Sequence, residues 1–570
     1  MERAISASLF NNRTVIMERA LLKPMFKVDE ITEDEKTGKF FAVLKYRDVD
    51  GVLRPITIPR ADLDRRNVLT ETLKNHGAYF SAVGTPNTHA LQGLAQSIPN
   101  AKRSKSAAHV GWYEGGYTTF VLPHRVIGGP PSGVSLRPPR KQSPVEGTKL
   151  LGDHAGWART VAAGGRFSSR MVLGISAALA APLLKMAGIH PFVILIHGQS
   201  KIGKSTMLLS AASVIGYGDE SDLPNFRATD AAFGEMPAAF NDSLLPLNEL
   251  GSLKGSARDR YQRLRDIAYG FADGVGTTYS SMATNTPASR LKWHSIALAT
   301  GEETLADIAR AAHEIRKGGE AIRFIDLAAA REGSVGIFDR IPKNVSEGET
   351  ADWIRQQCNL LRDGCRRNHG AAIEHFIEQV IAHPEKVKRD LMSLREKFVG
   401  TVRDVNDDAA VGHLAECFGH IYAAGVLGVR LGTLPWSEQL VRKCIKRCYY
   451  DARRELNTEA DLLHQGRRIL RKKIAALPKK RAWKKSADGF VTRTKVGKVH
   501  TATIAVQEFK SWFPDERQPN LVLTWLRSKN ALQSRAAAKP GNAVGWADSQ
   551  PKWPDGKRPH SIVIDMRAQD

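Results

Sequence analysis

Eight consecutive residues, Gly198 to Ser205, have the types and spacing of a loop that binds phosphate groups. They read GQSKIGKS and fit the pattern G-x-x-x-x-G-K-[ST] at every fixed position. In such a loop, backbone N–H groups and a helix N-terminus point at phosphates, the lysine neutralises the outer phosphates, and the last hydroxyl can ligate Mg²⁺. We therefore predict that the chain binds ATP and Mg²⁺. The residues expected to contact the nucleotide are Gly198, Gln199, Ser200, Lys201, Ile202, Gly203, Lys204, Ser205 and Thr206.

The flanking residues supply the strand and helix that this loop needs on either side. Phe192 to Ile196 is a short, apolar, β-branched run typical of a buried parallel strand. After Ser205, the sequence TMLLSAASVI has helical spacing, and Gly216 stands where a helix cap belongs. This context disfavours the alternative that the segment is a glycine-rich turn that binds nothing.

Hydrolysis also needs a carboxylate that organises the metal and a group that positions water. The apolar run from Ser243 ends in Asn248-Glu249, where Asp-Glu would be usual. We expect Glu249 to be the catalytic base and Asn248 to accept from a metal-bound water, although its amide brings no negative charge. Pro246 is awkward in a central strand because it removes a ladder donor. Both Asn248 and Glu249 could instead be structural, in a protein that binds ATP and hydrolyses it poorly.

Three later residues are candidates for completing the site. Thr300 ends another apolar run and stands where a sensor hydroxyl would contact the γ-phosphate or the attacking water. Arg316 or Arg323 could reach a neighbouring subunit's γ-phosphate as an arginine finger. An ordinary strand-end threonine and ordinary packing arginines are the alternatives. Several strands with such residues at their carboxyl ends predict a doubly wound parallel sheet.

The positive charge of the chain is concentrated in one region. The 570 residues carry a net charge of +24, and residues 441–500 hold 19 Lys and Arg against 5 Asp and Glu. Such a cluster favours a polyanionic partner, with nucleic acid favoured over an acidic membrane surface. A long insert before Ser295 has hairpin-like turn signals and could grip DNA, or it could be an ordinary loop. The candidate DNA contacts are Arg290 and Lys292 in that insert, and Arg467, Arg468, Arg471, Lys472, Lys473, Lys479, Lys480 and Arg481.

The cysteines and the N-terminus favour a cytoplasmic protein without a membrane partner. The five cysteines lack the spacing of a zinc site, which favours buried reduced thiols. The N-terminus has no apolar signal core. MERA occurs at both Met1 and Met17, so translation could start at either.

The expected fold class is α/β, with a P-loop core and smaller domains on either side. We expect a leader at 1–22, a β-rich domain at 23–127, a linker at 128–146, the P-loop ATPase domain at 147–345, a helical region at 346–465, a basic segment at 462–487 and a winged-helix-like domain at 488–570. The expected elements include strands at 40–44 and 52–58 joined by an Asp-Gly turn, helices at 62–76, 168–186, 503–512 and 520–526, and a last strand at 561–566.

Six motifs occur in the order of one family. They read GQSKIGKST, FRATD, LLPLNELG, ALATGEETL, IRKGGEAIRFIDL and VGIFD. In these motifs, over about residues 25–345, the chain resembles the phage, plasmid and genomic-island ATPases called domain-of-unknown-function 927, which include replicative helicases of cassette chromosome elements. The resemblance implies an AAA+-like module, a ring of subunits that is expected to be a hexamer, ATP-driven movement on DNA and a C-terminal winged helix.

The resemblance also assigns roles to single residues. The motif GQSKIGKST matches the family's phosphate loop, and Glu249 matches the second acid of the family's Asp-Glu pair. Thr300 matches the sensor, and Arg316 or Arg323 matches the arginine-bearing segment. The family usually has Asp where Asn248 stands, which puts hydrolysis in question. The leading expectation is an ATP-dependent DNA helicase or translocase of a mobile genetic element, acting in element replication. The alternatives are an ATP-binding switch that assembles on DNA with weak or no hydrolysis, and a non-enzymatic DNA-binding replication initiator.

Overall fold

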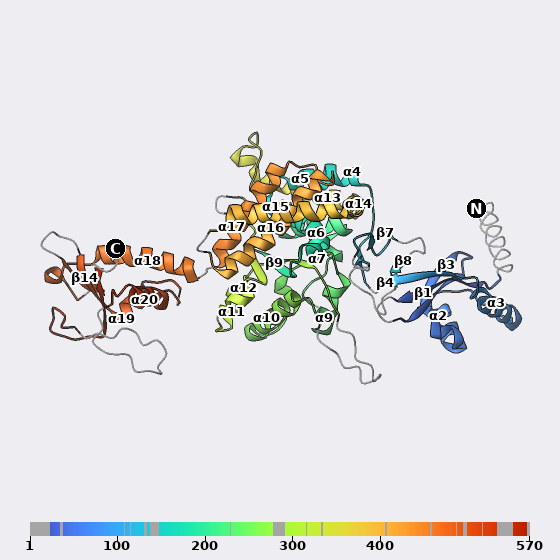
Figure 1. The fold of residues 1–570 in the computed structure, drawn as a ribbon, viewed down its shortest axis with the longest axis horizontal. Helices are drawn as coiled ribbons and strands as arrows, with labels where there is room; N and C mark the ends of the chain where they lie inside the picture. The colour runs from blue at the N-terminus through green and yellow to red at the C-terminus, as the bar shows by residue number, and fades with distance from the viewer. Residues whose placement is uncertain are drawn as a thin grey trace, which may run out of the picture. The chain divides into compact units, whose positions relative to one another are not determined.

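The computed structural model divides the chain into two units. One unit comprises residues 1–405 and 412–452, and the other comprises 406–411 and 453–570. Figure 1 labels their helices and strands. The structure describes residues 23–34, 38–107, 109–113, 116–129, 134–136, 147–227, 230–276, 291–314, 316–331, 334–404, 407–456, 459–485, 487–493, 499–515, 517–532 and 551–566.

The N-terminal part of the first unit is a five-stranded sheet with helices α2 (Arg66–Asn75) and α3 (Gly84–Ser97). A turn with Gly51 at φ 83° joins β2 and β3, so the predicted hairpin is confirmed. The strand β8 lies inside the segment expected to be a linker, because residues 134–136 pair in parallel with β4. The sheet order is β3-β2-β1-β4-β8, with β1 at Phe26–Asp34, β2 at Phe40–Arg47, β3 at Leu53–Pro59, β4 at Lys102–Ala107 and β8 at Val134–Leu136.

A second, smaller sheet contacts the part of the chain that holds the phosphate loop. It consists of β5 (Gly111–Trp112), β6 (Thr119–Val121) and β7 (Val126–Gly128). Trp112 donates its indole N–H to the carbonyl of Pro182 over 2.6 Å, and its backbone N–H to Asp242. These buried hydrogen bonds hold the small sheet against the P-loop region.

The central sheet is parallel and has the order β10-β11-β9-β12 among the described strands. Its strands are nearly all buried and apolar, as expected for a sheet covered on both faces. The prediction of a parallel α/β sheet is therefore confirmed. Pro246 is tolerated because β10 is the outermost of these strands, where a missing ladder donor costs little. The bounds are β9 Phe192–His197, β10 Leu244–Leu247, β11 Ile296–Gly301 and β12 Phe324–Ala328.

Helices cover this sheet and lead into it. The helix expected at 168–186 is divided by a 3₁₀ turn at Ala181–Leu183, where Pro182 removes a helical hydrogen-bond donor. Residues 169–187 are long and apolar enough to cross a membrane, but 94% of their most apolar stretch is buried inside the structure, as in a core helix. The helices here are α4 His154–Trp157, α5 Ala163–Gly165, α6 Ser169–Ala180, α7 Leu184–Ala187, α8 Lys204–Ile215, α9 Asp230–Ala239, α10 Ala257–Asp273, α11 Leu305–Ala311 and α12 Gly318–Ala321.

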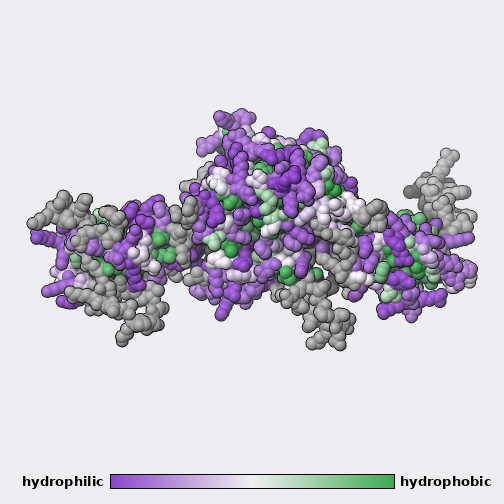
Figure 2. Space-filling view, viewed as in Figure 1, coloured by the Kyte–Doolittle hydropathy of each residue, from purple (hydrophilic) through white to green (hydrophobic). Residues whose placement is uncertain are grey.

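A helical region follows the sheet, as predicted. Its helices are α13 Thr350–Arg367, α14 Ala371–Ala382, α15 Pro384–Val402, α16 Ala409–Arg430 and α17 Glu438–Leu456. The five cysteines lie in α13, α16 and α17, and all are free and buried. The face drawn in Figure 2 is mainly hydrophilic, with hydrophobic residues scattered among polar ones.

The second unit has its own sheet and its own apolar core. The core joins residues of α18 and α20 to the antiparallel sheet β13-β14-β15. The helix at 520–526 and the strand at 561–566 are found close to their predicted bounds. The helix expected at 503–512 begins only at Val506, because Thr503 to Ala505 belong to β14. The bounds are α18 Glu459–Ala476, β13 Gly489–Arg493, β14 Val499–Ala505, α19 Val506–Ser511, α20 Gln518–Ser528 and β15 Ser561–Asp565.

Candidate nucleotide-binding site

The phosphate loop connects the end of β9 to the start of α8. Gly198, Lys201 and Gly203 have positive φ angles of 145°, 63° and 97°, so the backbone turns tightly between the strand and the helix. A Cβ at Gly203 would lie 2.7 Å from Cγ2 of Ile337, so both the backbone and the packing require glycine. Because α8 begins at Lys204, the free N–H groups of its first turn face the loop.

The side chain of Lys204 folds back onto the phosphate loop. Its Nζ donates to the carbonyls of Gly198, over 2.7 Å, and Gln199, over 2.6 Å. Burial lowers the pKa of Lys204 from its ordinary value, and the negative charges of Glu302 and Glu249 oppose that effect. The ammonium group therefore lies where phosphates would arrive, with two weak acceptors that a phosphate can replace.

Residues 335–339 cover the loop and tie it to the helical region. The backbone N–H of Ile337 donates to the carbonyl of Ile202 over 2.8 Å. Two residues later, Asp339 accepts from the backbone and hydroxyl of Ser169 and from Arg447 of α17, the last over 2.8 Å. This segment, which we call the strap, thus contacts both the phosphate loop and α17. Sequence reasoning used VGIFD as a family motif and assigned it no role.

The neighbouring strands β10 and β11, which lie on one side of β9, bring Thr300 to Asn248 and Glu249. The Thr300 hydroxyl donates to Oδ1 of Asn248 over 2.9 Å and accepts from the backbone N–H of Glu249 over 3.0 Å. Glu249 has a φ of 61° and an exposed side chain. The structure therefore brings these three predicted residues together on the loop side of the sheet. Their catalytic roles stay predictions.

Glu302 is a fourth polar residue at this edge, and sequence reasoning missed it. It follows β11, the strand directly beside β9, and the N–H of Gly198 donates to the carbonyl of Gly301 over 3.2 Å. The hydroxyl of Ser200, in the loop, donates to Oε1 of Glu302. The motif ALATGEETL contains the signal that could have found it, since an acid two residues after a strand-end threonine falls at the same sheet edge.

The two candidate finger arginines lie at the other end of the sheet. Arg323 immediately precedes β12, whereas the loop follows β9, so the parallel strands separate Arg323 from the loop of its own subunit. Its guanidinium stacks on Tyr269, 4.8 Å from the ring centre, and donates to Gly319. Arg316 is almost fully buried and is bonded to Asp326 and to the carbonyl of Phe324. Its geometry gives Arg316 a structural role, and the finger role stays a prediction for both.

The candidate DNA contacts near residue 290 are only partly described. Arg290 lies outside the described residues. Lys292 is exposed and forms an antiparallel bridge with Val275, and the N–H of Gly276 donates to the carbonyl of Leu291 over 2.8 Å. The two ends of the predicted hairpin insert are therefore paired.

The basic residues of the second unit divide into packed and exposed side chains. Arg467 is partly buried and stacks on Trp525, 4.4 Å from the ring centre, so it contributes to packing. Lys473 and Lys480 lie over aromatic rings at 5.7 and 5.6 Å. In the described part of the chain none of the exposed cations of this group forms an ion pair: Arg468, Arg471, Lys472, Lys473, Lys479, Lys480 and Arg481.

The described residues contain no group of three or more His, Cys, Asp or Glu that could hold a metal ion. A phosphate loop does not need one, because waters and the nucleotide's phosphates supply most of the Mg²⁺ ligands and the protein adds only one or two. Ser205 lies half-buried in the first turn of α8, beside Lys204. The residues present therefore fit an ATP·Mg²⁺ complex with Ser205 as a ligand.

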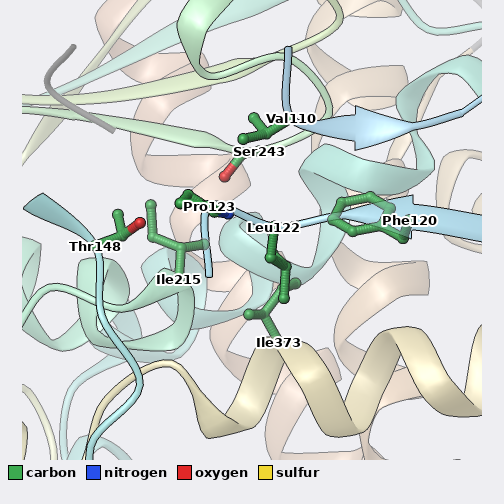
Figure 3. A pocket seen from close by; sticks show the side chains of 8 residues that line it. All are labelled: Val110, Phe120, Leu122, Pro123, Thr148, Ile215, Ser243 and Ile373. Atoms are coloured by element: carbon green, nitrogen blue, oxygen red, sulfur yellow. The ribbon is translucent and has the colours of Figure 1, made fainter. Parts of the chain in front are cut away.

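A separate hollow in the first unit is not part of this site. Figure 3 shows its lining, which is apolar except for Thr148 and Ser243. Ile215, at the C-terminal end of α8, lines it, whereas the phosphate loop lies at the N-terminal end of that twelve-residue helix. The two places are about 18 Å apart along the helix. The lining residues are Val110, Phe120, Leu122, Pro123, Thr148, Ile215, Ser243 and Ile373.

Comparisons with known proteins bear on the fold and on the family. Among curated proteins, none matches the chain. A solved structure titled "SCCmec type IV Cch - active helicase" is similar to this chain with a TM-score of 0.57 and 16% sequence identity, over 96% of this chain and 94% of that chain. At that identity the likeness shows a shared fold. Residues 12–289 match the model of the family described as "Domain of unknown function (DUF927)", a range that includes the phosphate loop. The chain therefore carries a domain of the DUF927 family, the family that its motif order predicts.

Proposed function

We propose that this chain is an ATP-dependent DNA helicase or translocase of a mobile genetic element, acting in element replication in the cytoplasm. One observation carries the proposal: a phosphate loop with Lys204 at its helix start faces Asn248, Glu249 and Thr300 at the ends of neighbouring strands. The similar solved structure is described as an active helicase, which supports the proposal.

In this proposal the loop residues bind and orient the triphosphate. Lys204 exchanges its two carbonyl acceptors for phosphate oxygens, and the N–H groups of the loop and of α8 donate to the same phosphates. Bound Mg²⁺ would balance the phosphate charge, with Ser205 as a ligand. Glu249 is exposed beside the loop and orients the attacking water, while Thr300 fixes its backbone.

A ring of subunits, expected to be a hexamer, would complete each site. An arginine at the opposite end of the sheet cannot reach the phosphate loop of its own subunit. As a finger it would therefore contact the nucleotide bound by a neighbouring subunit. Of the two candidates, Arg323 has the more accessible guanidinium, because Arg316 is bonded to Asp326. We therefore favour Arg323 as the finger.

The second unit is the proposed DNA-holding module. Its order of α18, β13, β14, α19, α20 and β15, with a bridge between Leu532 and Ile564, is compatible with a winged helix to which β13 adds a strand. The unpaired cations on and after α18 suit phosphate contacts, which fix position without reading sequence. Lys292, at the base of the hairpin insert, is a further candidate contact.

The decisive experiment measures ATP hydrolysis and fork unwinding by the full chain with and without DNA. The wild-type chain should hydrolyse ATP faster with DNA and separate a forked duplex. Lys204→Ala should lose nucleotide binding and both activities. Lys185→Ala is the matched control, because that lysine is exposed on α7 and lies outside the phosphate loop. Absence of nucleotide binding in the wild-type chain would refute the proposal.

One observation favours a second function, an ATP-binding switch that assembles on DNA with little hydrolysis. The Thr300 hydroxyl donates to Oδ1 of Asn248, so this oxygen already has a hydrogen-bond partner. The other polar group of the amide is its NH₂, which donates hydrogen bonds and cannot ligate a metal. Asn248→Asp discriminates the two functions. A switch should gain turnover with this change, and its wild-type form should bind DNA in a nucleotide-dependent way without unwinding.

A further inference from the structure

The nucleotide site lacks one negative charge at the place where it is usually found. Asn248 is neutral and its Oδ1 already accepts from Thr300. Mg²⁺ prefers oxygen ligands and is often bound through one or two carboxylates together with substrate phosphates. Two other carboxylates on the loop side of the sheet act on the charge of Lys204, those of Glu302 and Glu249.

Glu302 is the nearer of the two in sheet order. It follows β11, the immediate neighbour of β9, whereas Glu249 follows β10, one strand further away. Its carboxylate accepts from Ser200, inside the phosphate loop itself. Its negative charge also raises the pKa of Lys204 more than the charge of Glu249 does.

Among the described residues Glu302 forms no ion pair, and Lys204 interacts with its charge only at longer range. Its carboxylate is exposed, whereas the neighbouring Glu303 is paired with Arg260 over 2.6 Å. A capping or packing role would not require a carboxylate that faces a phosphate loop. A carboxylate beside a triphosphate repels it unless a cation lies between them.

We infer that Glu302 is the carboxylate that replaces the missing acid at position 248, accepting from a water or ligand position of the nucleotide-bound Mg²⁺. The inference rests on the proposed function of the loop, since it needs a bound triphosphate. It makes Glu302 a residue that binds the metal–nucleotide complex, whereas Glu249 keeps the role of orienting water.

The inference predicts two effects of opposite sign for Glu302→Gln. Without Mg²⁺, removal of a negative charge should tighten the binding of a triphosphate. With Mg²⁺, the concentration needed for half-saturation should rise by about tenfold or more, as when a residue that orders a metal site is lost. Gln keeps the size of the side chain and an oxygen that accepts from Ser200, so the fold should be retained.

The experiment titrates MgCl₂ into the full chain with a fluorescent ATP analogue, and measures nucleotide affinity in EDTA separately. Mn²⁺ binding followed by electron paramagnetic resonance gives a second readout that needs no turnover. Glu303→Gln is the matched control and should leave both affinities unchanged. Asn248→Asp combined with Glu302→Gln should return the Mg²⁺ requirement toward the wild-type value.

Three outcomes separate the possibilities. An unchanged Mg²⁺ requirement in Glu302→Gln overturns the inference. An equal increase in nucleotide affinity of Glu302→Gln with and without Mg²⁺ also overturns the inference. It would show that Glu302 only repels the triphosphate. If the wild-type chain and Lys204→Ala bind the analogue equally weakly, the proposed function itself fails, independently of Glu302.

Discussion

Thr300 and Asn248 are joined by a hydrogen bond of 2.9 Å between the ends of two neighbouring strands. The same hydroxyl oxygen accepts from the backbone N–H of Glu249. One side chain thus fixes both the amide that replaces the usual acid and the residue expected to orient water.

Replacing Thr300 with Val should loosen this junction. The change keeps the shape but leaves Oδ1 of Asn248 and the N–H of Glu249 without their partner, which costs about 1–3 kcal/mol for buried groups. Hydrogen exchange of the peptide spanning 244–253 should become faster. Thr300→Ser, which keeps the hydroxyl, should exchange like the wild-type chain, and equal exchange in Val and wild type would contradict the prediction.

Arg316→Ala should destabilise the first unit more than Arg323→Ala. The Arg316 guanidinium and Asp326 are almost fully buried, and removal of one partner of such a pair costs about 3–5 kcal/mol. Arg323 is only partly buried, and its loss removes a stacking contact with Tyr269. Urea unfolding of both variants checks the order. A stable Arg316→Ala chain that only loses hydrolysis would favour a finger role for Arg316.

His420 should make the chain less stable as the pH falls from 7 to 5. This histidine is fully buried in α16 and donates from Nε2 to the carbonyl of Ala180 over 2.9 Å. Burial lowers its pKa to about 4, against the weaker, opposing effect of that hydrogen bond, and Arg395 lowers it further.

The sign follows from proton binding. Below about pH 6.5 the unfolded chain binds a proton at His420 and the folded chain does not. The free energy of unfolding therefore falls by about 2 kcal/mol between pH 7 and pH 5. Urea midpoints at the two pH values should therefore shift less in His420→Gln than in the wild-type chain. Equal shifts would show that His420 does not contribute.

Neutralising cations of the second unit should weaken the salt dependence of DNA binding. If Arg468, Arg471 and Lys472 contact phosphates, each change to Gln should reduce the slope of log K against log salt by about 0.9 on duplex DNA and about 0.7 on single strands. Fluorescence anisotropy at several salt concentrations measures the slope. Lys386→Gln and Lys388→Gln, exposed on α15, provide the control and should leave it unchanged.

The strap should couple α17 to the phosphate loop. Asp339 and Arg447 are paired over 2.8 Å, and contacting charged residues show coupling energies of about 0.5–3 kcal/mol. A double-mutant cycle with Asp339→Asn and Arg447→Gln should therefore be non-additive in stability. Nucleotide affinity should fall in both variants, because Ile337 of the strap is bonded to Ile202. Additive stability with unchanged affinity would show that the strap is only a surface contact.

The residues with fixed local spacing were predictable from the sequence. The phosphate loop, its strand and its helix follow from a motif whose chemistry is local, and the apolar runs predicted the parallel sheet. Glu302 could not be assigned, because its contact with Ser200 depends on the pairing of β11 with β9, which are about a hundred residues apart in the chain.

Contacts made only in the folded chain also give residues roles that the motifs leave open. Arg316 and its partner Asp326 lie ten residues apart in the same motif, but they pair only because the chain turns back through α12 before β12 begins. Residues 134–136 lie in a Pro- and Gly-rich stretch, yet they pair with β4 because the sheet edge accepts a short strand. In both cases the sequence specifies the side chains but not the neighbours that give them a role.

The two bonds from Lys204 to the carbonyls of Gly198 and Gln199 give two of the three ammonium hydrogens acceptors within the loop itself. Capture of a ligand is then an exchange reaction, and only the difference between carbonyl and phosphate acceptors is released as heat. A short phosphate that cannot reach the ammonium gains little from this exchange. On the proposed function, this exchange favours polyphosphates long enough to reach the ammonium over shorter phosphates, before any contact with a base or sugar.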